Sequence, residues 1–235
     1  MGTGADSVDR LAVQRDQLTG PALEVAPLLL GATLVSDVGG DRVVVRITEV
    51  EAYEGQDDPA SHAFRGPTKR NAVMFGEAGH LYCYFIYGMH WCANITCQRS
   101  GTAGAVLLRA ADIAEGEPAA RDRTARAARD RTAQSARGRP ATAVPAGKLA
   151  SGPARLARSL GLTGSHTGLD LLSADSPVRL TMLDPPTGYR SGPRVGIAVA
   201  AEHPWRFWLP DAASVSAYRP GGLKRLVAKR QTGQP

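Results

Sequence analysis

Hydrophobic and polar positions alternate most regularly in residues 42–51, where β-branched residues and glutamates occupy every second position. Side chains on a β-strand point alternately to its two faces, so this pattern predicts a strand. One face carries Val43, Val45, Ile47, Glu49 and Glu51. We expect the three aliphatic residues to face the core and the same parity to carry the two carboxylates toward its rim.

A second alternating stretch, residues 81–97, predicts a β-hairpin with Tyr87-Gly88-Met89-His90 at its tip. Six aromatic residues and all three cysteines crowd into positions 75–97. Such density is typical either of a rich core or of a surface that stacks on flat rings. Alternation divides the hairpin into two faces. The residues that we expect to pack inside are Leu81, Phe85, Trp91, Cys83, Cys92 and Cys97.

Shorter apolar runs predict the remaining elements. We expect helices at 23–30 and 149–160, and short strands at 32–36, 105–110, 178–183, 194–201 and 205–209. Strands and helices are mixed without a regular βαβ rhythm, which favours an α+β fold with an antiparallel sheet. The sequence therefore predicts a single mixed domain that spans residues 19–218.

Three segments lack apolar periodicity. Residues 1–18 are polar and predict a flexible N-terminus, and residues 219–235 form a basic C-terminal tail. Residues 117–147 are rich in Ala and Arg, and Val144 is their only large aliphatic residue. This composition predicts a frayed helix followed by disorder. Taken alone, it favours a solvated insertion without a role.

Composition narrows the class of protein. The formal net charge of +6 is compatible with a polyanionic partner such as nucleic acid. Three cysteines cannot all pair within the chain, which favours a reducing compartment. The apolar run at 26–35 is too short to span a bilayer, so we expect a cytoplasmic protein. Scattered histidines, without nucleotide-binding or zinc motifs, predict neither a metal nor another cofactor.

A few polar residues are candidates for chemistry. Glu51 ends a half-buried strand, where a carboxylate is either paired with a cation or kept for proton transfer. Tyr53, His62 and Arg109 would complete a polar pocket if the fold brings them to Glu51. Asn94 either contacts a ligand or is a satisfied structural amide.

The hairpin tip is unusual because it carries two large apolar side chains, Tyr87 and Met89. They form either a wedge that unstacks nucleic-acid bases or a tip that folds back onto its own domain. Spacing alone favours the second interpretation.

Several motifs, in order along residues 23–217, resemble those of the alkyladenine (3-methyladenine) DNA glycosylases. They are Glu49-Val-Glu-Ala-Tyr-Glu-Gly55, Ser61-His62, the stretch Gly79–Met89, Asn94-Ile-Thr, Val106-Leu-Leu-Arg109, Leu149-Ala-Ser-Gly-Pro153, Pro193-Arg-Val-Gly-Ile197 and Trp205-Arg-Phe207. The resemblance implies a single mixed domain around a curved antiparallel sheet from which the hairpin protrudes. Two departures are the insertion at 117–147 and His90, where the family often has an aromatic residue.

The resemblance also implies a role for each matched residue. Glu51 would be the general base that activates water, and Arg109 would help to position that water. Tyr53, His62 and Tyr84 would sandwich a flipped base, and Asn94 would discriminate against guanine. Tyr87, with Met89 beside it, would be the wedge that enters the minor groove of DNA.

The implied protein is a monofunctional glycosylase that starts base-excision repair. It would act as a monomer on double-stranded DNA, flip an alkylated or deaminated purine and hydrolyse its N-glycosidic bond with water. The product would be an abasic site, and the protein would associate with the nucleoid when bound to DNA. The preferred lesion among 3-methyladenine, hypoxanthine and ethenoadenine stays open.

Two other classes of function compete with this one. A non-catalytic basic protein could bind nucleic acid by aromatic stacking, but stacking alone requires neither Glu51 nor Arg109. A transferase or hydrolase that acts without nucleic acid would leave Tyr87 and Met89 at the tip unexplained.

Overall fold

The structure is a computed structural model that describes residues 13–133, 144–181 and 186–221. Its helices there are α1 (Ala22–Leu28), α2 (Glu117–Ala133) and α3 (Pro153–Ser159). Its strands there are β1 (Thr33–Ser36), β2 (Val43–Tyr53), β3 (Leu81–Ile86), β4 (His90–Thr96), β5 (Ala105–Glu115), β6 (Val178–Thr181), β7 (Arg190–Gly192) and β8 (Arg206–Trp208). No helix in this part of the chain is both long and apolar enough to cross a membrane.

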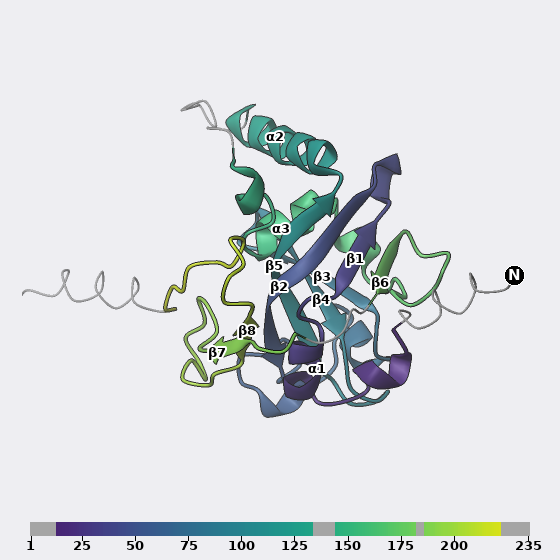
Figure 1. Cartoon of the computed structure of the whole chain (residues 1–235). Coiled ribbons are helices and arrows are strands. Elements are labelled where there is room, and N and C mark those ends of the chain that lie inside the picture. Colours follow the sequence, from purple (N-terminus) through teal and green to yellow (C-terminus); the bar gives the residue numbers. More distant parts are fainter. Residues whose placement is uncertain (1–12, 134–143, 182–185, 222–235) are drawn as a thin grey trace, which may run out of the picture.

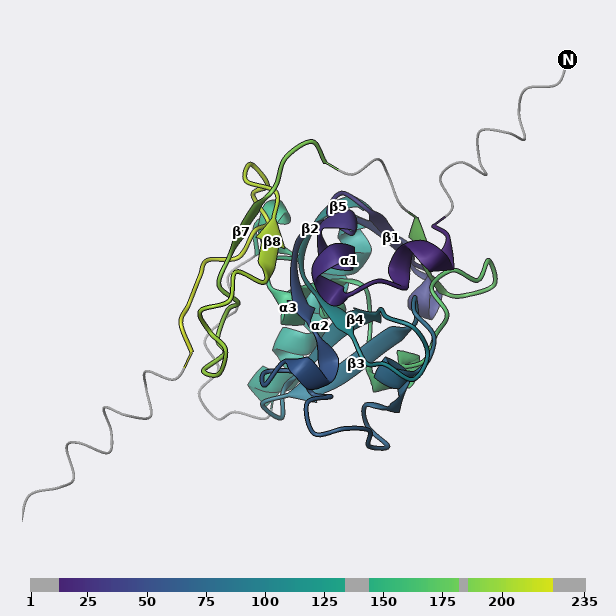
Figure 2. The same cartoon turned by 90° about the horizontal axis from the view of Figure 1, so that it is seen from below.

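The strands form one open sheet in which every pairing is antiparallel, in the order β3-β4-β5-β2-β1-β6 (Figure 1). One edge of β2 is shared, because β1 pairs with its first half and β8 pairs with Glu49–Glu51. The view from below shows β7 and β8 beside β2, and the hairpin β3–β4 at the other side of the sheet (Figure 2). These features confirm the predicted α+β class.

The pairing of β2 with β5 contains β-bulges beside the two glutamates. Ile47 lies opposite Ala111 and Glu49 opposite Ala110, so Thr48 is an extra residue on β2. Directly after it, Arg109 is an extra residue on β5. Bulges bend a strand and change the direction of a side chain, and they are frequent next to active sites.

Because of the bulge at Thr48, the predicted assignment of odd-numbered β2 residues to one face is wrong after Ile47. Val43, Val45 and Ile47 belong to the main hydrophobic core, as expected, but Val50 and Ala52 belong to it as well. One inserted residue exchanges the two faces of a strand, so the core positions change from odd to even numbers. Glu49 and Glu51 therefore face away from the core residues of their own strand.

The hairpin also differs in part from its predicted packing. Leu81, Cys83 and Cys97 lie in the core and Cys92 is buried, as expected, but Phe85 is 45% exposed. Phe85 packs on Trp91, with ring centroids 4.9 Å apart, because the hairpin extends past the core at this point. The expectation that Phe85 packs inside was therefore wrong.

Helix α2 covers the first half of the segment that composition predicted to be frayed or disordered. Its residues up to Ala133 are helical, and residues 134–143 lie outside the described part of the chain. The helix has no apolar stripe, but Ala120 is buried and Arg123 donates hydrogen bonds to the backbone carbonyls of Val38 and Ser159. Arginine contacts of this kind order a helix that periodicity does not predict.

Two further predictions change at the ends of the domain. The predicted flexible N-terminus lies mostly outside the described residues, but Leu18 is buried and Arg15 pairs with Asp170 at 2.7 Å. Residues 194–201 form no strand, and the side chain of Arg194 donates instead to the Ala52 carbonyl and the Asp58 carboxylate. The basic tail lies outside the described residues from 222 onward.

Candidate active site

A cavity of about 380 Å³ opens between β2, β5, the hairpin and two loops. Its volume falls within the range of about 300–1,000 Å³ that is typical of small-molecule sites. The cavity brings together seven residues that the sequence had singled out: Glu51, Tyr53, His62, Tyr84, Tyr87, Asn94 and Arg109. Met89 lies instead in a neighbouring hollow that it shares with Phe85 and Trp91.

Glu51 is fully buried and each of its carboxylate oxygens has a donor. The backbone N–H of Val195 donates to Oε1 at 2.6 Å, and Nη1 of Arg109 lies 3.2 Å from the same oxygen. The Tyr53 hydroxyl donates to Oε2 at 2.9 Å. Burial of a charge is costly unless it is paired and hydrogen-bonded, and these contacts supply both conditions.

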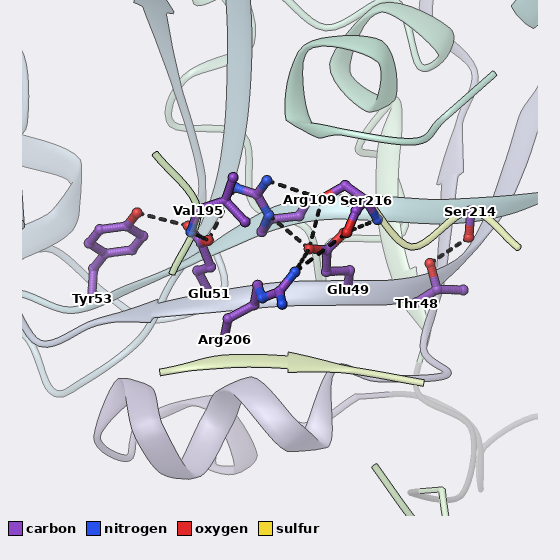
Figure 3. Close-up of polar contacts among 9 residues, drawn as sticks. All are labelled: Thr48, Glu49, Glu51, Tyr53, Arg109, Val195, Arg206, Ser214 and Ser216. Carbon is purple, nitrogen blue, oxygen red and sulfur yellow. Dashed lines mark hydrogen bonds and ion pairs between the residues drawn. The ribbon is translucent and has the colours of Figure 1, made fainter. Parts of the chain in front are cut away.

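Arg109 lies between two carboxylates, because Glu49 points to the same side of β2 as Glu51 (Figure 3). Its Nε donates to Oε1 of Glu49 at 3.0 Å, and its Nη2 donates to the Ser216 hydroxyl at 3.2 Å. Burial would lower the pKa of Arg109, but Glu51 and Glu49 outweigh burial and raise this pKa. The guanidinium thus stays charged.

Aromatic rings form a wall of the cavity. The His62 and Tyr84 ring centroids lie 4.4 Å apart, edge to face, and Nδ1 of His62 is 3.0 Å from the Tyr82 hydroxyl. Burial, and then the charge of Arg70, lower the pKa of His62. A neutral imidazole therefore stands at the exposed mouth of the cavity.

Tyr53, Tyr84 and Cys92 of the cavity stay protonated near neutral pH. Burial, followed by the charge of Glu51, raises the pKa of Tyr53 well above its ordinary value. Burial likewise raises the pKa of Tyr84, and it raises the pKa of the Cys92 thiol to about 11. These groups can donate hydrogen bonds, and the thiol is a poor nucleophile.

Asn94 is a structural amide on one side, and its role toward a ligand stays a prediction. Its Nδ2 donates to the backbone carbonyl of Tyr82 at 3.0 Å, which fixes the orientation of the amide. The side chain is nearly buried and lines the cavity, and its oxygen makes no hydrogen bond within the described residues. That oxygen is available to a ligand.

The two large apolar side chains at the hairpin tip are largely exposed. Tyr87 is 78% exposed and Met89 is 60% exposed. Tyr87 also has a positive φ of 54°, which is rare for a residue with a large side chain. Backbone strain of this kind is often kept for function.

Several residues of the site were not predicted from the sequence. Glu49 and Arg206 belonged to motifs but received no role, whereas Ser216 lies outside the motifs, in the C-terminal part of the chain. The signal that could have found Glu49 is its position two residues before Glu51 in an otherwise apolar strand. Among the described residues, no three His, Cys, Asp or Glu side chains gather as a metal site requires.

Comparisons with known proteins agree with this geometry. Residues 16–213 match the family model described as "Methylpurine-DNA glycosylase (MPG)". A protein of Leifsonia xyli subsp. xyli is 47% identical over 209 residues, which cover 87% of this chain and 92% of that protein. A Streptomyces avermitilis protein is 43% identical over 90% of this chain and 93% of its own. Both carry the name "Putative 3-methyladenine DNA glycosylase".

Proposed function

The chain belongs to the methylpurine-DNA glycosylase family, and from that premise we propose that it is a monofunctional 3-methyladenine DNA glycosylase. In this proposal it flips an alkylated or deaminated purine out of duplex DNA and hydrolyses the N-glycosidic bond, which leaves an abasic site. The observation that carries the proposal is the fully buried Glu51 carboxylate, paired with Arg109, in a cavity with aromatic walls.

The cavity suits a flipped purine. A base inside a duplex must leave the stack before its glycosidic bond can be reached, which costs a few kcal/mol and less for a damaged pair. Alkylated purines are cationic or electron-poor, so the rings of Tyr53, His62 and Tyr84 attract them by stacking and cation–π interactions. The side-chain oxygen of Asn94 contributes a polar contact to the base edge.

Glu51 then acts as the general base. It takes a proton from a water molecule that attacks C1′ of the sugar, while the bond from C1′ to the purine nitrogen breaks and the base leaves with the electron pair. The negative charge of Glu51 also stabilises the oxocarbenium-like sugar, as a carboxylate does in glycoside hydrolysis. Arg109 pairs with Glu51 at 3.2 Å and orients it.

Water is the nucleophile in this proposal because no lysine lines the cavity among the described residues. A lysine amine would be needed for a Schiff-base intermediate and strand cleavage. In this proposal the hairpin tip enters the minor groove and fills the gap left by the flipped nucleotide, and the exposure of Tyr87 and Met89 supports that role. The protein acts as a monomer on double-stranded DNA.

The test is release of damaged bases by the purified protein. Duplexes with a single 3-methyladenine, hypoxanthine or ethenoadenine are incubated with it, and abasic sites are cleaved with alkali. We expect strand breaks at the lesion, and a loss of about 100-fold or more in Glu51→Gln while DNA binding is kept. The matched control is Glu115→Gln, because Glu115 is exposed at the end of β5.

Equal turnover by Glu51→Gln and the parent protein would contradict the catalytic assignment. Binding without any base release by the parent protein would favour the competing class, a non-catalytic protein that stacks on bases. That class has a structural difficulty, since it gives no reason to keep the Glu51 charge fully buried beside the cavity.

A further inference from the structure

A second carboxylate lies next to the proposed general base. Glu49 is fully buried and its Oε1 accepts from Nε of Arg109 at 3.0 Å, Nη1 of Arg206 at 3.1 Å and Oγ of Ser216 at 2.9 Å. Its Oε2 accepts from the backbone N–H of Ser216 at 2.8 Å. The proposed chemistry does not use this group, yet it is the most densely bonded side chain of the site (Figure 3).

We propose that Glu49 is a positioning residue, which holds the Arg109 guanidinium so that a single nitrogen reaches Glu51, and that Ser216 keeps Glu49 in place. The inference rests on the proposed glycosylase function and assigns a part in it to Ser216, in the C-terminal part of the chain.

The geometry of arginine gives the physical reason. A guanidinium opposite one carboxylate prefers a bidentate pair, in which two parallel N–H groups bind both oxygens. Here the Nε edge of Arg109 is taken by Glu49 and the Nη2 by Ser216, so Nη1 alone contacts Glu51. The Arg109 guanidinium thus orients Glu51 through Oε1 alone. Oε2 of Glu51 keeps its contact with Tyr53 at the cavity.

Charge balance offsets the cost of burying the Glu49 carboxylate. Two carboxylates, Glu49 and Glu51, face two guanidiniums, Arg109 and Arg206, so the cluster is neutral. A carboxylate without a cation of its own would repel the Glu51 charge. Arg206 offsets that repulsion because it pairs with Glu49. The bulge on β5 places Arg109 between the two glutamates, since Arg109 is the extra residue at that register shift.

The C-terminal segment reaches β2 at two neighbouring points, which provides a matched control. Ser216 binds Glu49, and the fully buried Ser214 shares a hydrogen bond of 2.7 Å with Thr48. Both serines tie the same segment to the same strand. Ser216 alone contacts the charged cluster.

The experiment measures single-turnover base release against pH for Glu49→Gln, Ser216→Ala and Ser214→Ala. We expect the plateau rate of Glu49→Gln to fall by about 10- to 100-fold, since a misplacement of about 1 Å can cost about 100-fold. The acid limb of the Glu49→Gln pH–rate profile, where the rate falls as the pH decreases, moves to lower pH. Loss of a like charge and a freed Arg109 both favour ionised Glu51. Affinity for DNA that carries the lesion is unchanged.

The acid limb separates positioning from a merely structural role. The titratable groups that face Glu51 are Arg109, Tyr53, Tyr84 and Cys92, and their raised pKa values keep all four from titrating in that range. General loosening of the site lowers the rate without moving the limb to lower pH. Ser216→Ala removes one hydroxyl, so it carries the test if Glu49→Gln does not fold, and Ser214→Ala keeps the parent rate.

Each result decides between the alternatives. Parent-like rates in Glu49→Gln, an unmoved acid limb, or equal losses in the two serine variants overturn the inference. In all three cases the parent protein still releases the base and Glu51→Gln does not, so the glycosylase function stands. A parent protein without base release overturns both.

Discussion

The hydroxyl of Tyr53 donates a hydrogen bond to Oε2 of Glu51 at 2.9 Å, and its pKa is raised, by burial first and by the Glu51 charge second. The hydroxyl therefore stays protonated and stabilises the ionised carboxylate. We expect Tyr53→Phe to keep ring stacking but to move the acid limb of the pH–rate profile to higher pH. This is opposite to the direction expected for Glu49→Gln. Single-turnover base release at a series of pH values measures both shifts.

The control for this prediction is Tyr189→Phe, which removes a hydroxyl from a half-exposed tyrosine outside the cavity. It should leave the profile unchanged. A Tyr53→Phe profile that coincides with the parent profile would show that the hydrogen bond does not support ionised Glu51.

His62 should make lesion choice depend on pH. Its pKa is lowered from 6.5, by burial first and by the Arg70 charge second, so the ring is neutral at pH 7 and becomes charged at a lower pH than an ordinary histidine does. A charged ring repels a cationic base and leaves a neutral one little affected. We expect the ratio of 3-methyladenine to hypoxanthine release to fall as the pH decreases through that lowered pKa.

The comparison variant is His62→Phe, which keeps a ring but has no proton to gain. Its ratio of the two release rates should stay flat over the same pH range, because Tyr82 and Tyr84, which contact His62, have raised pKa values. A parallel fall in both proteins would assign the pH effect to the substrates.

The buried ion pair between Asp58 and Arg194 should contribute strongly to stability. Both side chains are fully buried, and Arg194 lies over the Tyr53 ring at 4.6 Å and the Trp205 ring at 4.9 Å. Removal of one partner leaves an unpaired buried charge, which costs about 3–5 kcal/mol. We expect that loss for Arg194→Met, measured by chemical denaturation.

An exposed ion pair, Arg42–Asp37, is the comparison for this loss of stability. Arg42, which is 57% exposed, lies 3.7 Å from Asp37, and Arg42→Met should cost less than about 1 kcal/mol. The double variant Asp58→Leu plus Arg194→Met should lose less than Arg194→Met alone, since no charge is then left buried. Equal losses for Arg194→Met and Arg42→Met would contradict this account.

The local sequence predicted which strands carry the site more accurately than it predicted the side of the sheet to which their side chains point. Alternation identified β2 and the hairpin, and the motifs indicated the residues that gather in the cavity. Alternation could not reveal Thr48 as a bulge, because a bulge is defined by the partner strand and leaves no mark in the strand's own pattern. The orientation of Glu49 therefore became visible only in the folded chain.

Contacts between distant segments account for the remaining differences. Ser216 lies 167 residues from Glu49, and no local pattern connects them. Helix α2 lacks apolar periodicity, but Arg123 anchors it through carbonyl groups 36 and 85 residues away. Sequence reasoning from periodicity detects burial of apolar faces and overlooks order that rests on such polar contacts.

Relief of the backbone strain at the hairpin tip should raise the free energy of unfolding and lower the rate of base release. Tyr87 and Gly88 both have positive φ, and the Met89 N–H donates to the Ile86 carbonyl at 3.1 Å, as in a type I′ turn. Asn is favoured at such positions, whereas a left-handed conformation costs most other residues about 1–2 kcal/mol. We expect Tyr87→Asn to stabilise the fold by about 0.5–1 kcal/mol and to impair release of bases from duplex DNA.

The matched control is Ala200→Asn, because Ala200 has a positive φ of 51° and does not line the cavity. It should gain a similar stability and keep the parent rate of base release. Thermal denaturation and single-turnover release, measured on the same preparations, test both variants. A Tyr87→Asn protein that is more stable and equally active would mean that the strain at the tip serves no wedge, since a side chain that fills the gap in the duplex cannot be shortened without loss.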